Sequence, residues 1–587
     1  MKGIHQKVRS IKPRLSAFDL SYAKLFTCEM GQLIPVMCEE CIPGDVWKIA
    51  NNTLIRMQPM VAPIIHDIDM FVHVFFVPYR LLFAGPDTGD AAGQTWERFI
   101  TGGEKAGIPG TPGYGNDGLA DVSLPRWQPS IPLGGSLKHS LWDYMGFPTD
   151  VISSGVALNP LDFPRRAYNF IYNNYYLDQV HQEPVSLTNE NVLLRNWQKD
   201  YFTSSLPDRQ KGVAPGFGVT GTGNIEFNAN FSPGSWGIPV IRLPSVSPGS
   251  SPLPLLTGGN VAGSVVGLYG HSNNAPLAQV TSSNMNWSSS EQLSDQFIAA
   301  FGKAGTQNFY TDLARGLRIQ SGSLVMNADV SDFRLAFAIQ RWMERNMRAG
   351  SRYFELLRSR WGVSPRDERL DRPEYIGGCR TPIVISEVLQ TSETTGYHPD
   401  EVLGGMAGHG ISGSSQYCGT YHVKEYGLIM GIMSIMPKPS YSQGIDKNWL
   451  RESRYDFPFP EFVNLSEQAV LQGEIYWKGV PDDRNPISYQ ARYDELRINR
   501  SVYCGDMRDT LDYWHLGRKF QNAPMINGEF IKCKPEETRH IFAVQTIINP
   551  DTGLEEPVPG LIVNCGNIIR AIRPIPYMAE PGLIDHV

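Results

Sequence analysis

Apolar side chains occupy both faces of a short stretch near residue 70. The residues that fall on one side of a period-2 pleat are all apolar, namely Ile68, Met70, Val72, Val74 and Phe76. Most of the other side is apolar as well, through Phe71, Phe75 and Val77. β-branched and aromatic residues favour strands, and Pro78 ends the pattern because proline cannot donate to a sheet ladder. The pattern predicts a strand over 66–78 that is buried on both faces.

A second apolar run, at 426–436, is the best partner for this strand. Residues 79–425 separate the two runs, so we expect one β core that carries very large insertions. The second run is also only about half as long as the roughly 20 residues that a membrane helix needs. No apolar signal-peptide core follows Met1, and we expect neither secretion nor membrane insertion.

Length and composition fit a loop-rich β protein. At 587 residues the chain exceeds the usual single-core domain of roughly 100 to 200 residues. It is 41% hydrophobic and 11% aromatic, with 57 Gly and 43 Pro, which excludes a disordered chain and favours many turns. The predicted fold class is mainly β, with very large loop insertions and a few helices.

Two regions have the spacing of helices. In the first, Pro164 suits a first helical turn, and tyrosines recur at i, i+4, i+7 and i+8, at Tyr168, Tyr172, Tyr175 and Tyr176. We expect this stripe to be core or a subunit contact. The second region, 331–361, is predicted to break into two helices at Gly350. Its side chains expected to face inward are Phe333, Ala336, Phe337, Trp342 and Met343.

Residues 212–290 differ in composition from the rest of the chain. Gly, Pro and Ser make up 34 of these 79 residues, and the formally charged ones are Glu226 and Arg242. Interspersed aromatic and β-branched residues argue against a purely flexible linker. We predict a projecting, partly ordered surface insertion, because long insertions in compact proteins are commonly functional. A passive surface loop is the alternative.

Charge restricts any nucleic-acid contact to a local site. The formal net charge is −7 and the pI about 6.0, so the chain as a whole is no basic nucleic-acid coat. The exception is an arm at 1–18 without acidic residues. Its cations are Lys2, Lys7, Arg9, Lys12 and Arg14. Such an arm can neutralise the phosphates of a nucleic acid without reading its sequence, and the alternative is a solvated tail.

No motif supports catalysis, a metal site or a cofactor. Residues Gly408 to Gly413 match G-x-G-x-x-G, but the flanks lack the buried strand and the helix that nucleotide binding requires. We interpret this stretch as a glycine-rich loop. Cys38 and Cys41 have C-x-x-C spacing without a second ligand pair, and the eight cysteines are irregularly spaced, as in free thiols. We therefore predict no catalytic residue, no metal, no cofactor and no enzyme.

A distinctive block lies at 196–207, with the sequence NWQKDYFTSSLP. Other blocks occur along nearly the whole chain: FDLS from Phe18, RPEYIGG from Arg372, QGID from Gln443, YQARYDE from Tyr489 and WHL from Trp514. In this order the blocks resemble the major capsid protein of microviruses, the small icosahedral single-stranded DNA bacteriophages, and more closely its gokushovirus branch. Several motifs in the right order make the resemblance specific.

The resemblance implies a single eight-stranded antiparallel jelly roll, with 66–78 and 426–436 inside its two sheets. It implies assembly through pentamers into a T=1 icosahedral shell around a circular single-stranded DNA genome, which the arm at 1–18 would face. The expected segments are jelly-roll strands with loop and helical insertions at 19–211, a spike-like insertion at 212–290, and, at 291–587, a helical insertion, the last strands and an extended tail.

The partners implied are other copies of the chain, the DNA, phage scaffolding, DNA pilot and small DNA-binding proteins, and a bacterial surface receptor. The chain would reside in the virion after assembly in the host bacterial cytoplasm. Candidate receptor contacts are Trp236, Tyr269 and Trp287, and the same rings can instead pack the insertion internally. The alternative function is a carbohydrate-active or carbohydrate-binding β-sandwich protein with paired carboxylates in a cleft.

Overall fold

The computed structural model describes most of the chain between Arg14 and Met578. The described residues are 14–83, 96–101, 124–130, 137–149, 159–214, 225–227, 240–242, 266–269, 276–280, 317–319, 330–349, 352–389, 406–465, 467–548 and 555–578. They fall into two compact units. The first unit comprises 1–214 and 340–587, and the second comprises 215–339.

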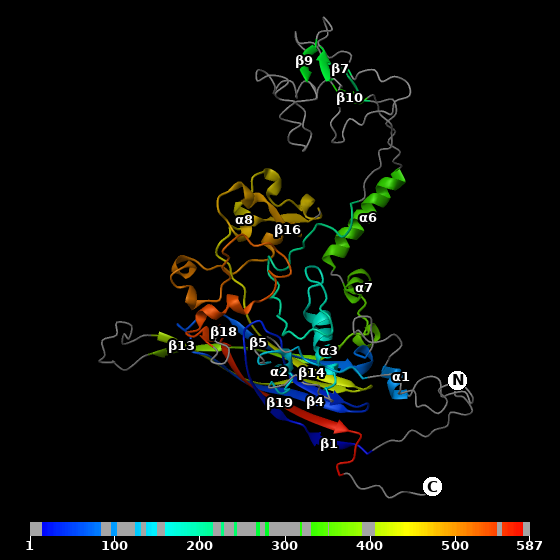
Figure 1. Cartoon of the computed structure of the whole chain (residues 1–587), viewed down its shortest axis with the longest axis vertical. Helices are drawn as coiled ribbons and strands as arrows, with labels where there is room; N and C mark the ends of the chain where they lie inside the picture. Colours follow the sequence, from blue (N-terminus) through cyan, green and yellow to red (C-terminus); the bar gives the residue numbers. More distant parts are fainter. Residues whose placement is uncertain are drawn as a thin grey trace, which may run out of the picture. The chain divides into compact units, whose positions relative to one another are not determined.

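Two antiparallel sheets form the centre of the first unit (Figure 1). The larger sheet contains β1 (Ser16–Asp19), β2 (Tyr22–Cys28), β4 (Val46–Met57), β12 (Val384–Leu389), β13 (Met406–His422) and β19 (Leu561–Arg573). The smaller sheet contains β3 (Ile34–Cys41), β5 (Ile68–Pro78), β11 (Glu374–Pro382) and β14 (Gly427–Pro437). The larger sheet has the order β1-β19-β4-β13-β12, with β2 also paired to β19, and the smaller has the order β11-β5-β14-β3.

The predicted central strand and its partner are both confirmed, as β5 and β14. They pair antiparallel in one continuous register from Gly427↔Pro78 to Pro437↔Ile68. Every residue of β14 is buried, and most of β5 is buried as well. These two strands are the middle of the smaller sheet, with β11 and β3 at its edges.

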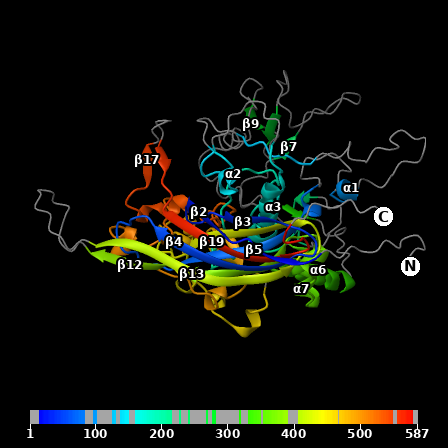
Figure 2. The ribbon, with the colours of Figure 1, turned by 90° about the horizontal axis from the view of Figure 1, so that it is seen from below.

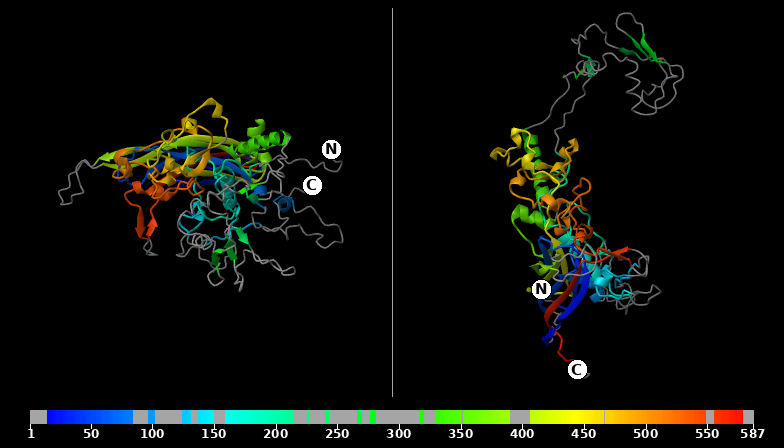
Figure 3. Two further views of the ribbon diagram at one scale, coloured as in Figure 1. Left: turned by 90° about the horizontal axis from the view of Figure 1, so that it is seen from above. Right: turned by 90° about the vertical axis from the view of Figure 1, so that its left-hand side faces the viewer.

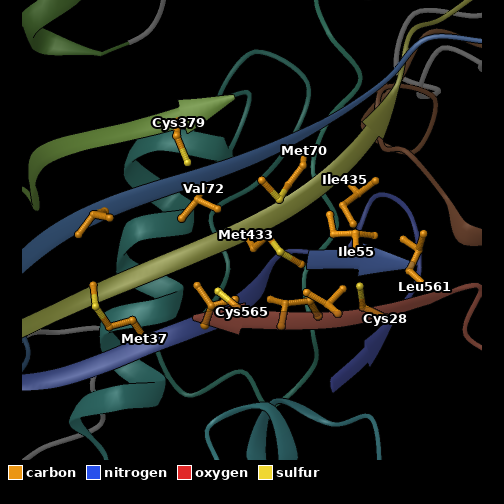
Figure 4. Close-up of a cluster of buried hydrophobic side chains, with 14 of the residues drawn as sticks. Cys28, Met37, Ile55, Met70, Val72, Cys379, Met433, Ile435, Leu561 and Cys565 are labelled. Carbon is orange, nitrogen blue, oxygen red and sulfur yellow. The ribbon is translucent and has the colours of Figure 1, made fainter. Parts of the chain in front are cut away.

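A hydrophobic core fills the space between the two sheets, which lie against each other in Figure 3. Val72 and Met433 of the smaller sheet point toward Ile55 and Cys565 of the larger one (Figure 4). Each strand contributes alternate residues to this core because side chains alternate across a pleat. The sheets are therefore held together by residues far apart in the sequence.

The other face of the smaller sheet is covered by helices. α2 (Leu141–Tyr144), α3 (Phe163–Ile171) and the π-helical turn η3 (Tyr172–Tyr176) pack on it in a second hydrophobic cluster (Figure 2). Pro164 lies in the first turn of α3, as predicted. Tyr168 is fully buried and donates from its hydroxyl to Leu33 O at 2.8 Å. Tyr172 is buried as well, whereas Tyr175 and Tyr176 are partly buried, so the first half of the tyrosine stripe is core.

The G-x-G-x-x-G stretch lies in a strand, and the prediction of a glycine-rich loop is wrong. It belongs to β13, which pairs with both β4 and β12. A Cβ on Gly408 would lie 2.5 Å from Ala62 O, and one on Gly410 would lie 2.3 Å from Met57 Sδ. The glycines therefore permit close packing of the strand rather than a turn, a role that the sequence pattern alone does not distinguish.

A lobe of short elements, residues 440–548, completes the first unit. It contains β15 (Gln468–Leu471), α8 (Gln472–Ile475), β16 (Pro486–Gln490) and β17 (Thr546–Ile548), which pairs with β18 (Glu555–Pro557). The block at 196–207 ties this lobe to the sheets. Asp200 Oδ2 accepts a hydrogen bond from Tyr441 at 2.6 Å, and Glu474 Oε2 accepts one from Tyr201 at 2.7 Å.

Two helices confirm the prediction for 331–361. They are α6 (Val330–Arg348) and α7 (Tyr353–Trp361), and Gly350 lies between them, outside the described residues. The expected inward orientation of two aromatic side chains is wrong, because Phe337 is 71% exposed and Trp342 is 54% exposed. Among the residues of α6 whose burial is described, only Met347 is buried, so this helix contributes little to the described core.

The remaining elements are short. In the first unit, α1 (Trp96–Thr101) accompanies the 3-10 turns η1 (Tyr79–Leu81), η5 (Asp367–Leu370), η6 (Lys447–Trp449), η7 (Arg454–Asp456), η8 (Pro460–Phe462), η9 (Pro481–Arg484), η10 (Asp494–Leu496), η11 (Gly505–Arg508), η12 (Asp512–Trp514), η13 (Pro535–Glu537) and η14 (Arg539–Ile541). In the second unit, β6 (Ile225–Phe227) pairs with β10 (Leu317–Ile319), and β8 (Val266–Tyr269) lies between β7 (Val240–Arg242) and β9 (Pro276–Val280).

Candidate nucleic-acid interface

The basic arm begins at an edge of the larger sheet. Lys2, Lys7, Arg9 and Lys12 lie outside the described residues, so their contact with DNA stays a prediction. Arg14 is described and exposed, just before β1. β1 pairs with the last residues of β19, from Ser16↔Arg573 to Asp19↔Arg570. The arm is therefore attached beside the outward face of this sheet.

That outward face of the larger sheet is solvent-exposed in the described chain. Along β4 and β19, buried residues alternate with exposed ones, so one face packs on the core and the other faces solvent. We call the exposed set the open face. It comprises Leu25, Lys48, Asn52, Leu54, Arg56, Ile411, Ser415, Tyr417, Ile562, Asn564, Ile568, Arg570 and Ile572.

Three cations of the open face have no ion-pair partner among the described residues. Lys48 and Arg570 lie directly opposite each other on β4 and β19, and Arg56 lies opposite Ile562. Like charges that face each other across strands destabilise a sheet, by about 0.2 to 1 kcal/mol. An anion bound over this face would relieve that repulsion.

One carboxylate, Asp19, lies beside these cations on the edge strand β1. The Ser21 hydroxyl and backbone N–H donate to Asp19 Oδ1 at 2.5 and 3.0 Å. These bonds, with the charge of Arg570, hold the pKa of Asp19 below its usual range. Asp19 is thus ionised at neutral pH, and it offsets only part of the positive charge of the open face.

The open face also offers an exposed ring. Tyr417 is 62% exposed and lies opposite Ala50 on β4, close to Lys48 in the register. Cations bind backbone phosphates, and exposed aromatic rings stack on unpaired bases. The arrangement is chemically suited to single-stranded nucleic acid, and the phosphates would be recognised without sequence readout.

The structure places one of the three candidate receptor contacts. Tyr269 ends β8, opposite Val240 of β7 and Pro276 of β9. Trp236 and Trp287 lie outside the described residues. The role of all three in attachment stays a prediction.

The acidic residues of the lobe have structural roles, which weakens the alternative of a glycoside-cleaving enzyme. A cavity of about 820 Å³ in the lobe contains Asp456, Glu467, Asp483 and Glu495. Glu467 pairs with Arg348, and Asp483 Oδ2 accepts hydrogen bonds from the backbone of Lys478, Gly479 and Val480. Backbone donation from Ser453 lowers the pKa of Asp456, which does not suit a general acid.

The described parts of the chain contain neither a metal-binding cluster nor a membrane-spanning helix. These residues contain no group of three or more His, Cys, Asp or Glu side chains that could hold a metal ion. Their helices include none that is both long and apolar enough to cross a membrane. All eight cysteines are described and are free thiols, as expected from their spacing.

The open-face cations Lys48, Arg56 and Arg570 were not predicted as functional residues. The signal that could have found them is the period-2 alternation in V-W-K-I-A-N-N-T-L-I-R-M at 46–57, where Lys48, Asn52 and Arg56 share one phase. Which face of a strand stays uncovered depends on the packing of the other elements, which the alternation does not reveal.

Comparisons with known proteins agree on one family. The family model described as "Capsid protein (F protein)" matches residues 6–583. The capsid protein VP1 of Chlamydia phage 1 is 30% identical, over 99% of this chain and 98% of the relative. The capsid protein VP1 of Bdellovibrio phage phiMH2K is 30% identical over 92% of each chain. That of Spiroplasma virus 4 is 25% identical, over 97% of this chain and 95% of the relative.

Proposed function

Given that this chain belongs to the microvirus F-protein capsid family, and is thus a major capsid protein of a single-stranded DNA phage, we propose that it forms a T=1 icosahedral shell whose inner surface is the open face. The observation that carries the orientation is the set of unpaired cations on the open face, next to the attachment of the basic arm. The chain is a structural component of the virion and no enzyme.

The proposed architecture of the subunit is an eight-stranded jelly roll. The support is the order of strands, β2-β19-β4-β13 in one sheet and β3-β14-β5-β11 in the other. Chain segments pass from one sheet to the other between β2 and β3, between β4 and β5, and between β14 and β19. A double-sheet jelly roll has such crossings.

Assembly is supported by the large apolar surface of the lobe. The exposed residues there include Trp449, Tyr455, Phe457, Phe459, Val463, Leu465 and Trp477, with Trp449 78% exposed. Monomeric proteins rarely expose contiguous apolar patches of this kind, whereas subunits of closed assemblies bury them against each other. We propose contacts through pentamers in the shell.

Three further roles follow from the family and are proposals for this chain. The arm at 1–18 would neutralise phosphates of a packaged circular single-stranded genome, in the same way as the open face. The second unit would contact a bacterial surface receptor. Scaffolding, DNA pilot and small DNA-binding proteins would act with the shell during assembly.

The test is to produce the full chain in bacteria with a single-stranded phage genome and to purify the resulting particles. Electron microscopy measures their symmetry, and quantification of nuclease-protected DNA measures packaging. Closed T=1 shells that protect DNA are the expected result. A monodisperse monomer under conditions in which the Chlamydia phage 1 relative assembles would contradict the proposal.

A further inference from the structure

A socket with aromatic walls lies on the helix-covered side of the smaller sheet. It has a volume of about 290 Å³ and is lined by His73, Phe75, Tyr175, Tyr176, Arg195, Asn196 and Tyr375. We call this set the socket. The ring centroids of Phe75 lie 4.7 Å from Tyr175 and 5.5 Å from Tyr375. Tyr375 is 48% exposed and forms the rim.

The one cation of the socket lacks a counterion. Arg195 Nη1 donates to Ser434 Oγ at 2.7 Å, and its guanidinium stacks on Phe71 at 4.2 Å. No described carboxylate pairs with Arg195, and its other guanidinium nitrogens have no hydrogen-bond acceptor among the described residues. Burial lowers the pKa of this guanidinium, since the charged form is incompletely solvated.

The other titratable groups of the socket do not supply the missing anion. Burial raises the pKa of the Tyr175, Tyr176 and Tyr375 hydroxyls, which stay neutral at physiological pH. His73 Nδ1 lies 2.8 Å from the Tyr176 hydroxyl. Burial and the nearby Arg195 lower the pKa of His73 to about 4, so the imidazole is neutral at physiological pH. The socket therefore combines stacking surfaces with one uncompensated positive charge, which makes it complementary to an apolar group that carries a carboxylate.

The lobe presents such a group on its surface. Residues 457–463 read F-P-F-P-E-F-V, and we call them the knob. Phe457 is 52% exposed and Phe459 is 44% exposed. Glu461 is exposed between them and Val463, and no described cation pairs with it. Glu461 therefore has no cationic partner among the described residues, just as Arg195 has no anionic one.

The knob is held in a fixed shape. Pro458 and Pro460 restrict the backbone, and Pro460 begins the turn η8. The Tyr493 hydroxyl accepts from Phe459 N at 3.3 Å and donates to Phe457 O at 3.2 Å. A preformed protrusion loses little conformational entropy on binding.

We propose that the knob of one copy inserts into the socket of a neighbouring copy, with Glu461 paired to Arg195 and the knob phenylalanines packed on the exposed ring of Tyr375. The contact is head-to-tail, because the two surfaces belong to different parts of the same chain, and contacts of this kind form a ring when the rotation between copies closes. Aromatic and arginine residues in a desolvated pocket are typical anchors of protein interfaces. The inference rests on the proposed function, since it assigns one of the contacts of the shell.

Cysteine cross-linking tests the contact directly. In a Cys504→Ser background, which removes the exposed native thiol, the full chain carries Tyr375→Cys and Glu461→Cys and is assembled and oxidised mildly. We expect a ladder of disulfide-linked dimers and larger oligomers on a denaturing gel. The matched control is Tyr375→Cys with Trp449→Cys, which places the second thiol outside the knob and is expected to remain monomeric.

A double-mutant cycle that removes the two charges singly and together provides the second test. Arg195→Met and Glu461→Gln are each expected to weaken association about tenfold, and the double variant to weaken it no further, because each single change already removes the pair. Arg195→Met removes an unpaired cation and is expected to leave the melting temperature of the unassembled chain unchanged or raised, which separates this loss from misfolding.

The outcomes distinguish this inference from the proposed function. Shells that form without the 375–461 cross-link, or single variants that assemble like the parent chain, would overturn the knob and socket and leave the shell proposal intact. Cross-linked ladders together with nonadditive losses would support it. A parent chain that forms no oligomer under any assembly condition would overturn the proposed function itself.

Discussion

The two sheets of the first unit are built from similar strands, yet one is covered on both faces and the other on a single face. In the smaller sheet, β14 is buried at every position, because the core covers one side and α3 with its neighbours covers the other. In the larger sheet, β19 alternates buried and exposed residues. The charged residues of the open face therefore contribute no packing to the core, and we propose that they contact the packaged DNA.

The largest expected difference between the sheets is in the cost of removing an isoleucine. Ile435 of β14 is 1% exposed, and Ile568 of the open face is 39% exposed. Ile435→Ala should lower the free energy of unfolding by about 2–5 kcal/mol because it leaves a cavity. Ile568→Ala, the matched control, should change it by about 0.5 kcal/mol or less. Urea unfolding of the purified chain measures both, and equal losses would contradict the assignment of the open face.

A pH titration tests the buried sheet through its histidine. The pKa of His73 is lowered from about 6.5 to about 4, so folding favours the neutral imidazole. Its contribution is complete above pH 6.5 and is lost as the pH falls from 6.5 toward 4. The loss is up to about 3 kcal/mol at pH 4. His73→Gln should remove this part of the acid sensitivity, as measured by melting temperature against pH. A variant with the same pH profile as the parent chain would contradict the assignment of this sensitivity to His73.

Two glycines of β13 allow the same comparison between the packed side of the larger sheet and its open face, with smaller expected changes in stability. A Cβ on Gly408 would meet Ala62 O at 2.5 Å, whereas Gly413 has nothing within 4 Å of an added Cβ. Gly408→Ala should destabilise the chain by about 1–3 kcal/mol through overpacking. Gly413→Ala should be close to neutral. Thermal melts of the two variants measure the difference, and a neutral Gly408→Ala would show that the strand can shift away from Ala62.

The variant with the smallest expected change in the free energy of unfolding is the one expected to change DNA binding most. Combining Lys48→Ala with Arg570→Ala should stabilise the chain by up to about 1 kcal/mol, since the opposed charges are removed. The same variant should bind single-stranded DNA more weakly, and the slope of log affinity against log salt should fall by about 1.4.

The control for that variant is Arg484→Ala, which removes an exposed cation that is already paired with Glu452 in the lobe. Its salt slope should match that of the parent chain, as measured by fluorescence anisotropy at several salt concentrations. Equal slopes for all three proteins would show that the open face does not contact phosphates.

The sequence predicts the covered sheet better than the open one. Apolar side chains on both faces of 66–78 and the near-continuous apolar run at 426–436 indicate buried strands, and these two segments are neighbouring strands of the smaller sheet. The helical spacing of the tyrosines after Pro164 predicted core or a subunit contact, and Tyr168 and Tyr172 are buried. The periodicity of apolar residues indicates which faces of a strand are buried. A strand buried on both faces gives a strong signal because most of its residues are apolar.

The open face and the socket depend on contacts between distant segments, which periodicity does not contain. Lys48 and Arg570 are brought opposite each other by the pairing of β4 with β19, near the two ends of the chain. No described residue provides a counterion for Arg195, because the socket around it is built from β5, η3 and β11, which are far apart in the sequence and contribute no carboxylate there. Gly408 and Gly410 fit a loop motif in sequence, but they lie in a strand paired with a distant neighbour, where the missing side chains make room for Ala62 and Met57.

The orientation of the open face in the virion is the central claim, and a cryo-electron microscopy map of DNA-filled particles tests it most directly. The account predicts that Lys48, Arg56 and Arg570 line the lumen, with density for nucleic acid within contact distance of these side chains and of Tyr417. A map in which the open face is covered by a neighbouring subunit, or lies on the outer surface of the shell, would contradict it.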